Sequence, residues 1–232
     1  VQQRLPSLLD DPIAFAHRGA RAHAPENTLA AFDLALKLGV NGLESDVWTT
    51  SDGVVVMDHD GVVRQSLGRK TPISKLRRAQ LPSHIPTLAE MIERCGTAYH
   101  LSLDLKDVES GQGVIDVVRE MAPGLLERVW LCSPTWETLI PLRGQGAKLV
   151  DSTRIARIKE GPERRAATLA AQGLDGLNMH HTDWNGGLVA LCHRFDLCAF
   201  SWDLQEMHLL ERALRMGIDG VFSDYPDRLV DA

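Results

Sequence analysis

The sequence predicts an α/β fold of the (β/α)8 barrel type, with an extra hairpin and a short excursion after the second strand. Short apolar runs of strand-like composition alternate with segments of helical periodicity along the 232 residues. This alternation is typical of parallel β/α units, and eight such units in a chain of this length fit a closed barrel. An open, doubly wound sheet is the alternative, but no glycine-rich phosphate motif follows the first predicted strand.

The predicted strands are short, apolar and bounded by turn residues. They lie at residues 13–17, 42–47, 99–105, 129–132, 148–151, 176–179, 197–202 and 218–223. Helices are predicted between them, at residues 28–38, 88–95, 113–121, 136–142, 163–172, 188–194 and 207–216. Thr87 and Glu90 form a capping box before the second helix, and Gly39 and Gly217 occupy helix-ending positions.

One stretch interrupts the alternation, between the second strand and Thr87. Asp52 and Gly53 make a tight-turn dipeptide, and residues 54–57 then form an extra hairpin strand that leads to His59. Residues 60–86 are rich in basic residues and prolines, and we expect them to be a short excursion over the barrel mouth without a core of its own. The prediction is therefore one domain over residues 1–232, with 60–86 as an insertion.

Composition disfavours several classes of partner. The net charge of -6 and the lack of a basic stripe with interleaved aromatics disfavour nucleic-acid binding. No apolar stretch approaches the length of a membrane span, so no integral membrane segment is expected. The four cysteines show no CxxC spacing, which favours a reducing, cytoplasmic compartment, although a cleaved export signal is compatible with a chain that begins at Val1. The sequence does not predict an oligomeric state.

Carboxylates recur at the ends of the predicted strands, where a buried charge needs a partner. The two-residue period of a strand sends Glu44 and Asp46 to one face, and Asp104 and Lys106 share a face of the next strand. Oxygen ligands of this kind predict a site for a hard divalent cation, Mg²⁺ or Ca²⁺, with Mn²⁺ as a further option. Ordinary salt bridges are the alternative, such as Lys106 with Asp104 or Asp107.

Two histidines and an arginine stand near these carboxylates in the predicted fold. His17 and Arg18 end the first strand, and His59 follows the extra hairpin. The histidines can carry protons, and a guanidinium suits phosphate binding, so the combination with a hard cation indicates hydrolysis of a phosphate ester. The alternatives are a hydrogen-bonded core histidine at His17 and a simple ion pair between Arg18 and Glu44.

Several short motifs occur in order from about Ala14 to Leu229. They are His17-Arg18-Gly19, Pro25-Glu26-Asn27-Thr28, Glu44-Ser45-Asp46, Asp52-Gly53, His59-Asp60, Ile85-Pro86-Thr87-Leu88 and the segment GIDGVFSDYPD at 217–227. This series resembles the glycerophosphodiester phosphodiesterase family. The resemblance implies a (β/α)8 barrel that hydrolyses glycerophosphodiesters to glycerol 3-phosphate and an alcohol, in glycerol and lipid metabolism.

The resemblance also implies a role for each strand-end side chain. It makes metal ligands of Glu44, Asp46 and Asp104, an acid–base pair of His17 and His59, and substrate or phosphate contacts of Arg18, Lys106 and Trp202. Family members usually carry Glu where this chain has Asp104, so the third ligand departs from the family pattern. Whether water or the neighbouring glycerol hydroxyl is the nucleophile stays open.

Two other functions remain as alternatives. The string Leu103-Asp104-Leu105-Lys106 resembles the venom phospholipase D relatives of the family, which makes a lysophospholipase D or sphingomyelinase D-like activity the first alternative. A non-catalytic phosphate-binding barrel is the second. The short insertion predicts an open mouth, in which Trp202 would cover a choline head group, and we expect a small, soluble diester such as glycerophosphocholine or glycerophosphoethanolamine as the substrate.

A second histidine group lies just beyond the sixth predicted strand. His180, His181 and Asp183 have spacing that would allow a second metal centre. The sequence lacks the paired histidines on the first strand that an amidohydrolase-type zinc site needs. A substrate contact or a plain loop is therefore the expectation for this group.

Overall fold

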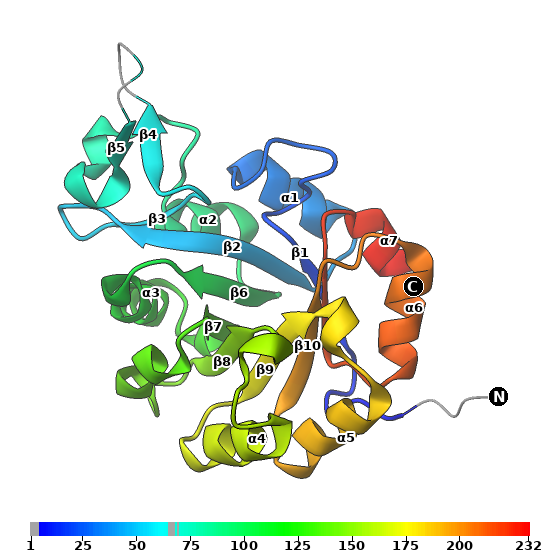
Figure 1. Ribbon diagram of the computed structural model, residues 1–232. Helices are drawn as coiled ribbons and strands as arrows, with labels where there is room; N and C mark the ends of the chain where they lie inside the picture. Colours follow the sequence, from blue (N-terminus) through cyan, green and yellow to red (C-terminus); the bar gives the residue numbers. More distant parts are fainter. Residues whose placement is uncertain (1–4, 65–67, 69) are drawn as a thin grey trace.

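The computed structural model describes residues 5–64, 68 and 70–232, and its centre is a closed barrel of parallel strands (Figure 1). The ring consists of β1 (Ile13–Ala16), β2 (Gly42–Thr49), β6 (His100–Leu105), β7 (Val129–Ser133), β8 (Lys148–Thr153), β9 (Gly176–His180), β10 (Cys198–Trp202) and β11 (Gly220–Ser223). β1 pairs in parallel with both β2 and β11, which closes the ring. The predicted barrel is confirmed, and the open-sheet alternative is wrong.

Helices surround the ring (Figure 1). They are α1 (Leu29–Lys37), α2 (Leu88–Cys95), α3 (Val108–Met121), α4 (Pro162–Ala171), α5 (Gly186–Arg194), α6 (Met207–Arg215) and α7 (Pro226–Asp231). Thr87 and Glu90 cap α2 reciprocally as predicted, and Gly39 and Gly217 both have positive φ after their helices. No helix in the described part of the chain is both long and apolar enough to cross a lipid bilayer.

Two helical segments differ from the prediction. Residues 136–142 form the 3₁₀ helix η5 (Trp136–Leu142), because Pro141 has no N–H to donate to an α-helical bond. α3 begins five residues earlier than expected, since the Asp107 side chain accepts a hydrogen bond from Ser110 N at 2.7 Å. Gly111 and Gly113 let this early turn lie against the barrel, because a Cβ at these positions would meet side chains at 2.5 and 2.7 Å.

The extra hairpin is confirmed, and the insertion after it has more structure than expected. β3 (Val55–Met57) runs antiparallel to β2, after the Asp52-Gly53 turn. Within the insertion at 60–86, β4 (Val62–Arg64) pairs with β5 (Lys70–Pro72), and the 3₁₀ turns η2 (Ile73–Lys75) and η3 (Arg78–Gln80) follow. A small apolar cluster, which includes Val56 from β3, holds these elements to the barrel. Residues 65–67 and 69 of the predicted insertion lie outside the described residues.

The core has two parts, one between the strands and the helices and one inside the ring. Inside the ring, Phe15 stacks on Phe222 at 4.5 Å between ring centroids and meets Phe200 edge-on at 5.6 Å. Cys132 and Cys198 are buried in the same interior cluster, and all four cysteines are free thiols. These apolar side chains fill the interior of the barrel below the carboxyl ends of the strands.

Asp219 closes the seam between the first and last parts of the chain. Its backbone oxygen accepts from Ile13 N at 2.8 Å, at the start of β1, and its backbone N donates to Ala199 of β10 at 2.8 Å. Its fully buried carboxylate accepts four hydrogen bonds, at 2.6 to 2.9 Å, from Ser7 Oγ, Leu8 N, His193 Nε2 and Ala199 N. Through its backbone and its side chain, this one residue thus ties the N-terminal segment, α5 and two strands together.

We expect Asp219→Asn to lower the free energy of unfolding by roughly 3 kcal/mol or more, because an amide cannot accept four hydrogen bonds and leaves buried donors unpaired. Urea unfolding followed by circular dichroism measures the change. Asp11→Asn, an exposed carboxylate just before β1, is the matched control and should change stability by no more than about 0.5 kcal/mol. Equal stability of the two variants would contradict the role of Asp219.

Candidate functional site

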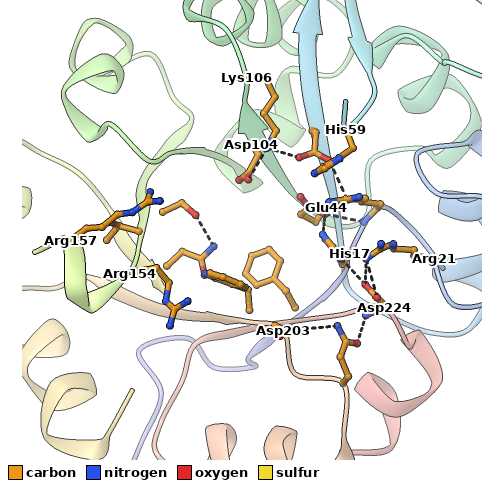
Figure 2. A pocket seen from close by; sticks show the side chains of 18 residues that line it. His17, Arg21, Glu44, His59, Asp104, Lys106, Arg154, Arg157, Asp203 and Asp224 are labelled. Carbon is orange, nitrogen blue, oxygen red and sulfur yellow. Dashed lines mark hydrogen bonds and ion pairs between the residues drawn. The ribbon is translucent and has the colours of Figure 1, made fainter. Parts of the chain in front are cut away.

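A pocket of about 640 Å³ lies at the carboxyl ends of the ring strands and contains every side chain that the sequence marked as a site residue (Figure 2). The predicted residues that line it are His17, Arg18, Glu44, Asp46, His59, Asp104, Lys106 and Trp202. Parallel strands all point their carboxyl ends to one edge of the ring, so residues far apart in sequence meet here. The remaining lining residues are Arg21, Ser152, Thr153, Arg154, Arg157, Asn178, Asp203, Gln205, Phe222 and Asp224.

Three carboxylates form the centre of this pocket. Asp46 of β2 and Asp104 of β6 are direct partners in the strand register, and Glu44 points to the same side. Oxygens of all three lie within 4.8 Å of one another, with Glu44 and Asp46 almost fully buried. Burial, with smaller contributions from the charges of Asp46 and Asp104, raises the pKa of Glu44 to about 8 although the charge of His17 opposes them. The negative charges of Asp46 and Asp104 thus lie beside a Glu44 carboxyl that is shielded from water.

Arg18 and Lys106 compensate part of this charge. Lys106 Nζ lies 2.8 Å from Asp46 Oδ1 and 3.6 Å from Asp104 Oδ2. Arg18 donates its backbone N–H to Glu44 Oε2 at 2.9 Å, while its guanidinium lies 3.0 Å from Glu26 and 3.3 Å from Asp46 Oδ2. A side-chain pair between Arg18 and Glu44, the alternative to a site role, is thus not what forms.

The carboxylate group fits a hard divalent cation. Asp46 Oδ2 is buried without a well-aligned hydrogen bond in the described chain, because the Arg18 Nε contact at 3.3 Å has poor hydrogen-bond geometry. A free, buried carboxylate oxygen beside two further carboxylates is the donor set that Mg²⁺ and Ca²⁺ prefer. The predicted ligands Glu44, Asp46 and Asp104 therefore form a group that can hold a metal ion.

His17 is oriented by a residue from the other end of the chain. Its Nδ1 lies 2.6 Å from Asp224 Oδ1, and its Nε2 lies 3.8 Å from Glu44 Oε2. Burial by itself would lower the pKa of His17, but the charge of Glu44 and the hydrogen bond to Asp224 outweigh it, so the pKa is raised. Asp224 in turn is held by Arg21 at 3.1 Å. His17 is hydrogen-bonded, as in the alternative interpretation, but it lines the pocket and its side chain is 28% exposed, so it is not a core histidine.

His59 comes from the loop after β3 and is half-exposed in the pocket. Its Nδ1 lies 2.9 Å from Asp60 Oδ1, which leaves Nε2 as the nitrogen available to a ligand. The extra hairpin places it there, since β3 runs back along β2 and ends next to Asp46. Both predicted proton carriers thus reach one pocket, from two different segments.

The second histidine group has a different third member from the one predicted. Asp183 binds Arg154 in a bidentate pair, at 2.6 and 3.2 Å, and is not available to His180. Asp203, after β10, takes its place, with Oδ2 at 3.1 Å from His180 Nε2. Sequence spacing could not reveal the contact between Asp203 and His180, because Asp203 follows β10, the next strand along the chain.

Several pocket residues were not anticipated. Arg154 and Arg157 follow β8, which extends two residues beyond its predicted end and so carries them to the mouth. Asp224 directly follows the last strand, and its strand-end position was the one local signal that could have marked it. Its contact with His17 spans 207 residues of sequence.

Comparison with known proteins gives a consistent result. The model of the glycerophosphoryl diester phosphodiesterase family matches residues 17–228. A glycerophosphodiester phosphodiesterase of Caldanaerobacter subterraneus subsp. tengcongensis is 25% identical to the chain, over 94% of this chain and 96% of the relative. The solved structure of a glycerophosphodiester phosphodiesterase from Thermotoga maritima shares the fold, with a TM-score of 0.82 and 23% identity, over 96% of this chain and 99% of that one.

One solved relative contains a bound product. The structure of an Oleispira antarctica phosphodiesterase in complex with the product sn-glycerol-3-phosphate is similar to this chain with a TM-score of 0.80 and 25% identity. The similarity covers 95% of this chain and 97% of that one.

We expect Asp224→Asn to lower the pKa of His17 in the metal-free protein, because the substitution removes a negatively charged hydrogen-bond acceptor from Nδ1. NMR titration of the His17 ring protons measures this. Asp227→Asn, which removes the partner of His23 instead, is the control and should leave the His17 titration unchanged. An unchanged His17 pKa in Asp224→Asn would rule out the hydrogen bond.

Proposed function

The chain belongs to the glycerophosphoryl diester phosphodiesterase family, and from this premise we propose that it hydrolyses glycerophosphodiesters to glycerol 3-phosphate and an alcohol with the help of a divalent cation. The observation that supports this best is the meeting of three carboxylates with His17 in one pocket, at 3.8 Å from Glu44 Oε2 to His17 Nε2. Groups for binding a cation, a phosphate and a proton are thus present together.

Glu44, Asp46 and Asp104 would hold the cation, and Mg²⁺ or Ca²⁺ suits these oxygens best, with Mn²⁺ as the third option. When bound, such an ion neutralises the diester and acts as a Lewis acid on its phosphoryl oxygens. Its charge would also offset the repulsion that raises the pKa of Glu44.

Arg18 and Lys106 would bind the remaining phosphate oxygens. Arg18 is held between Glu26 and Asp46, and Lys106 between Asp46 and Asp104, so both side chains already lie beside the carboxylates where the phosphate would bind. A preorganised guanidinium and ammonium would stabilise the charge that builds up on the phosphoryl group.

His17 and His59 would transfer the protons. One accepts the proton of the attacking oxygen, and the other donates a proton to the leaving alcohol oxygen. Asp224 accepts from His17 Nδ1, which fixes the tautomer and points Nε2 towards Glu44. Detection of a cyclic glycerol phosphate would identify the neighbouring hydroxyl, rather than water, as the attacking group.

A soluble diester is favoured over a lysophospholipid. Among the described residues that line the pocket, only Trp202 and Phe222 carry large apolar side chains, and the rest are polar or charged. An acyl chain would therefore lack an apolar channel beside the carboxylates. The lysophospholipase D-like and the non-catalytic alternatives both predict a different result in the assays that follow.

Release of glycerol 3-phosphate from soluble diesters should require a divalent cation, because excess chelator would leave the three carboxylates without their counterion. Asp104→Asn should weaken the apparent cation affinity by about tenfold or more, whereas Asp104→Glu, which keeps the charge, should retain it. Enzyme-coupled detection of glycerol 3-phosphate across a cation titration measures both. Full activity in excess chelator, or equal affinity in Asp104→Asn and the parent chain, would contradict this ligand set.

Replacement of either proposed proton carrier should reduce kcat on the order of a hundredfold or more, since proton transfer contributes that much to such reactions. We expect this of His17→Ala and His59→Ala, each with cation affinity close to that of the parent chain. Steady-state kinetics and a cation titration give the two values. His208→Ala, an exposed histidine of α6, is the control, and near-parental kcat in His17→Ala or His59→Ala would exclude that residue.

A further inference from the structure

Two arginines border the pocket on the side opposite the proposed proton carriers. Arg154 precedes the 3₁₀ turn η6 (Ile155–Arg157) directly after β8, Arg157 is the last residue of that turn, and both line the pocket. Figure 2 shows them across the opening from His17 and His59. Of the two groups esterified to a phosphate at the carboxylates, glycerol carries no charge for a guanidinium to bind, so these arginines suit the alcohol, and their side is called the alcohol side of the pocket below.

Arg154 is held in place before any ligand binds. Its guanidinium makes a bidentate pair with Asp183, and Asp183 Oδ2 also accepts from Ile155 N at 3.1 Å. The charged group is therefore fixed by Asp183 of the turn after β9, which reduces the entropy lost on binding.

Trp202 does not offer a free aromatic face to a cationic head group. The Arg154 guanidinium lies 5.7 Å from the Trp202 ring centroid, and the His180 ring meets Trp202 edge-on at 4.6 Å. A choline or ammonium group would have to displace one cation and approach a second, Arg157, which is unfavourable in a partly enclosed pocket. The choline contact expected for Trp202 is thus opposed by its own neighbours.

Arg157 carries positive charge that nothing in the described chain balances. No carboxylate of the described residues forms an ion pair with it, and its side chain is exposed at the pocket edge. The acidic residue on this side, Asp203, is engaged by His180 at 3.1 Å and by Gln205 Nε2 at 3.2 Å. Arg154 is balanced by Asp183 and Asp203 keeps its own charge, so among the described residues on this side Arg157 is the guanidinium left to pair with an acidic group of a ligand.

Asn178 adds a buried polar group that lacks a partner. It lines the pocket from β9, is 5% exposed, and donates Nδ2–H to Ser152 Oγ at 3.3 Å. Its Oδ1 is buried with no hydrogen-bond partner in the described chain. A ligand hydroxyl, which both donates and accepts, would satisfy this amide in either orientation.

We infer that the alcohol side of the pocket binds an anionic, hydroxyl-bearing alcohol, with Arg154 and Arg157 as contacts to its acidic group and Asn178 as a contact to a hydroxyl. The preferred substrates are then glycerophosphodiesters of a phosphorylated polyol, and choline diesters are poor ones. This inference rests on the proposed phosphodiesterase function and specifies the leaving group of that reaction. The bond broken is the same phosphoester bond, and the leaving oxygen takes up one proton.

The test compares glycerophosphoinositol with glycerophosphoinositol 4-phosphate, which differ only in one phosphate, and with glycerophosphocholine. We expect kcat/KM to be about tenfold higher for the phosphorylated diester than for its parent, the gain of one or two charge-assisted contacts, and lowest for the choline diester. Arg157→Gln should bring the ratio of the two inositol diesters close to one, while Arg157→Lys should retain part of it.

The matched control is Lys159→Gln, which removes the same charge two residues further along this segment but outside the pocket. It should keep the ratio of the parent chain. Cleavage of all three diesters with similar kcat/KM, or a preference for the choline diester, would overturn this inference and leave the proposed function intact. A ratio that falls as much in Lys159→Gln as in Arg157→Gln would also overturn it, because general charge rather than contact would then be responsible. Cleavage of none of them would overturn both.

Discussion

Closure of the barrel by Asp219 is the constraint on which the rest of this structure depends. A barrel has no free edge only if its first strand pairs with its last, and β1 pairs with β11 over four residues. Asp219 lies at this seam and binds the N-terminal segment, α5 and β10 through one buried carboxylate. Because the ring is closed, the carboxyl ends of β1, β2 and β11 are neighbours, which brings His17, Glu44 and Asp224 together.

Buried carboxylates are compensated by hydrogen bonds at the amino end of the ring and lie close to one another at the carboxyl end. At the amino end, each carboxylate oxygen of Asp219 accepts two hydrogen bonds, so the buried charge is compensated and stabilises the fold. At the carboxyl end, Glu44, Asp46 and Asp104 repel one another and burial raises the pKa of Glu44 to about 8. The phenylalanine cluster between the two ends keeps water away from the floor of the pocket, which strengthens both effects. Stability and proposed chemistry are thus separated along the barrel axis.

The pocket itself is divided into two sides with different chemistry. One side concentrates carboxylates with Arg18 and Lys106 between them, as a phosphate and a cation together would require. The other side carries Arg154 and Arg157 with few apolar groups, and its tryptophan is covered by Arg154. The loops after β8 and β9 together determine the chemistry of this side, because Arg154 from the first pairs with Asp183 from the second and is thereby held near the Trp202 ring. The proposed reaction and the inferred leaving-group preference therefore rest on different segments of the chain.

The sequence by itself determined the ring of strands and which carboxylates share a strand face. Alternating apolar positions and local capping signals are short-range properties, so β2, the extra hairpin and the Thr87 capping box could be predicted from neighbouring residues. Glu44 and Asp46 share a face for the same reason. What only the tertiary structure decided are the contacts between distant segments, such as Asp224 with His17 and Asp203, rather than Asp183, with His180. Pairing across 207 residues depends on how the closed ring arranges its strands, and no local pattern encodes that.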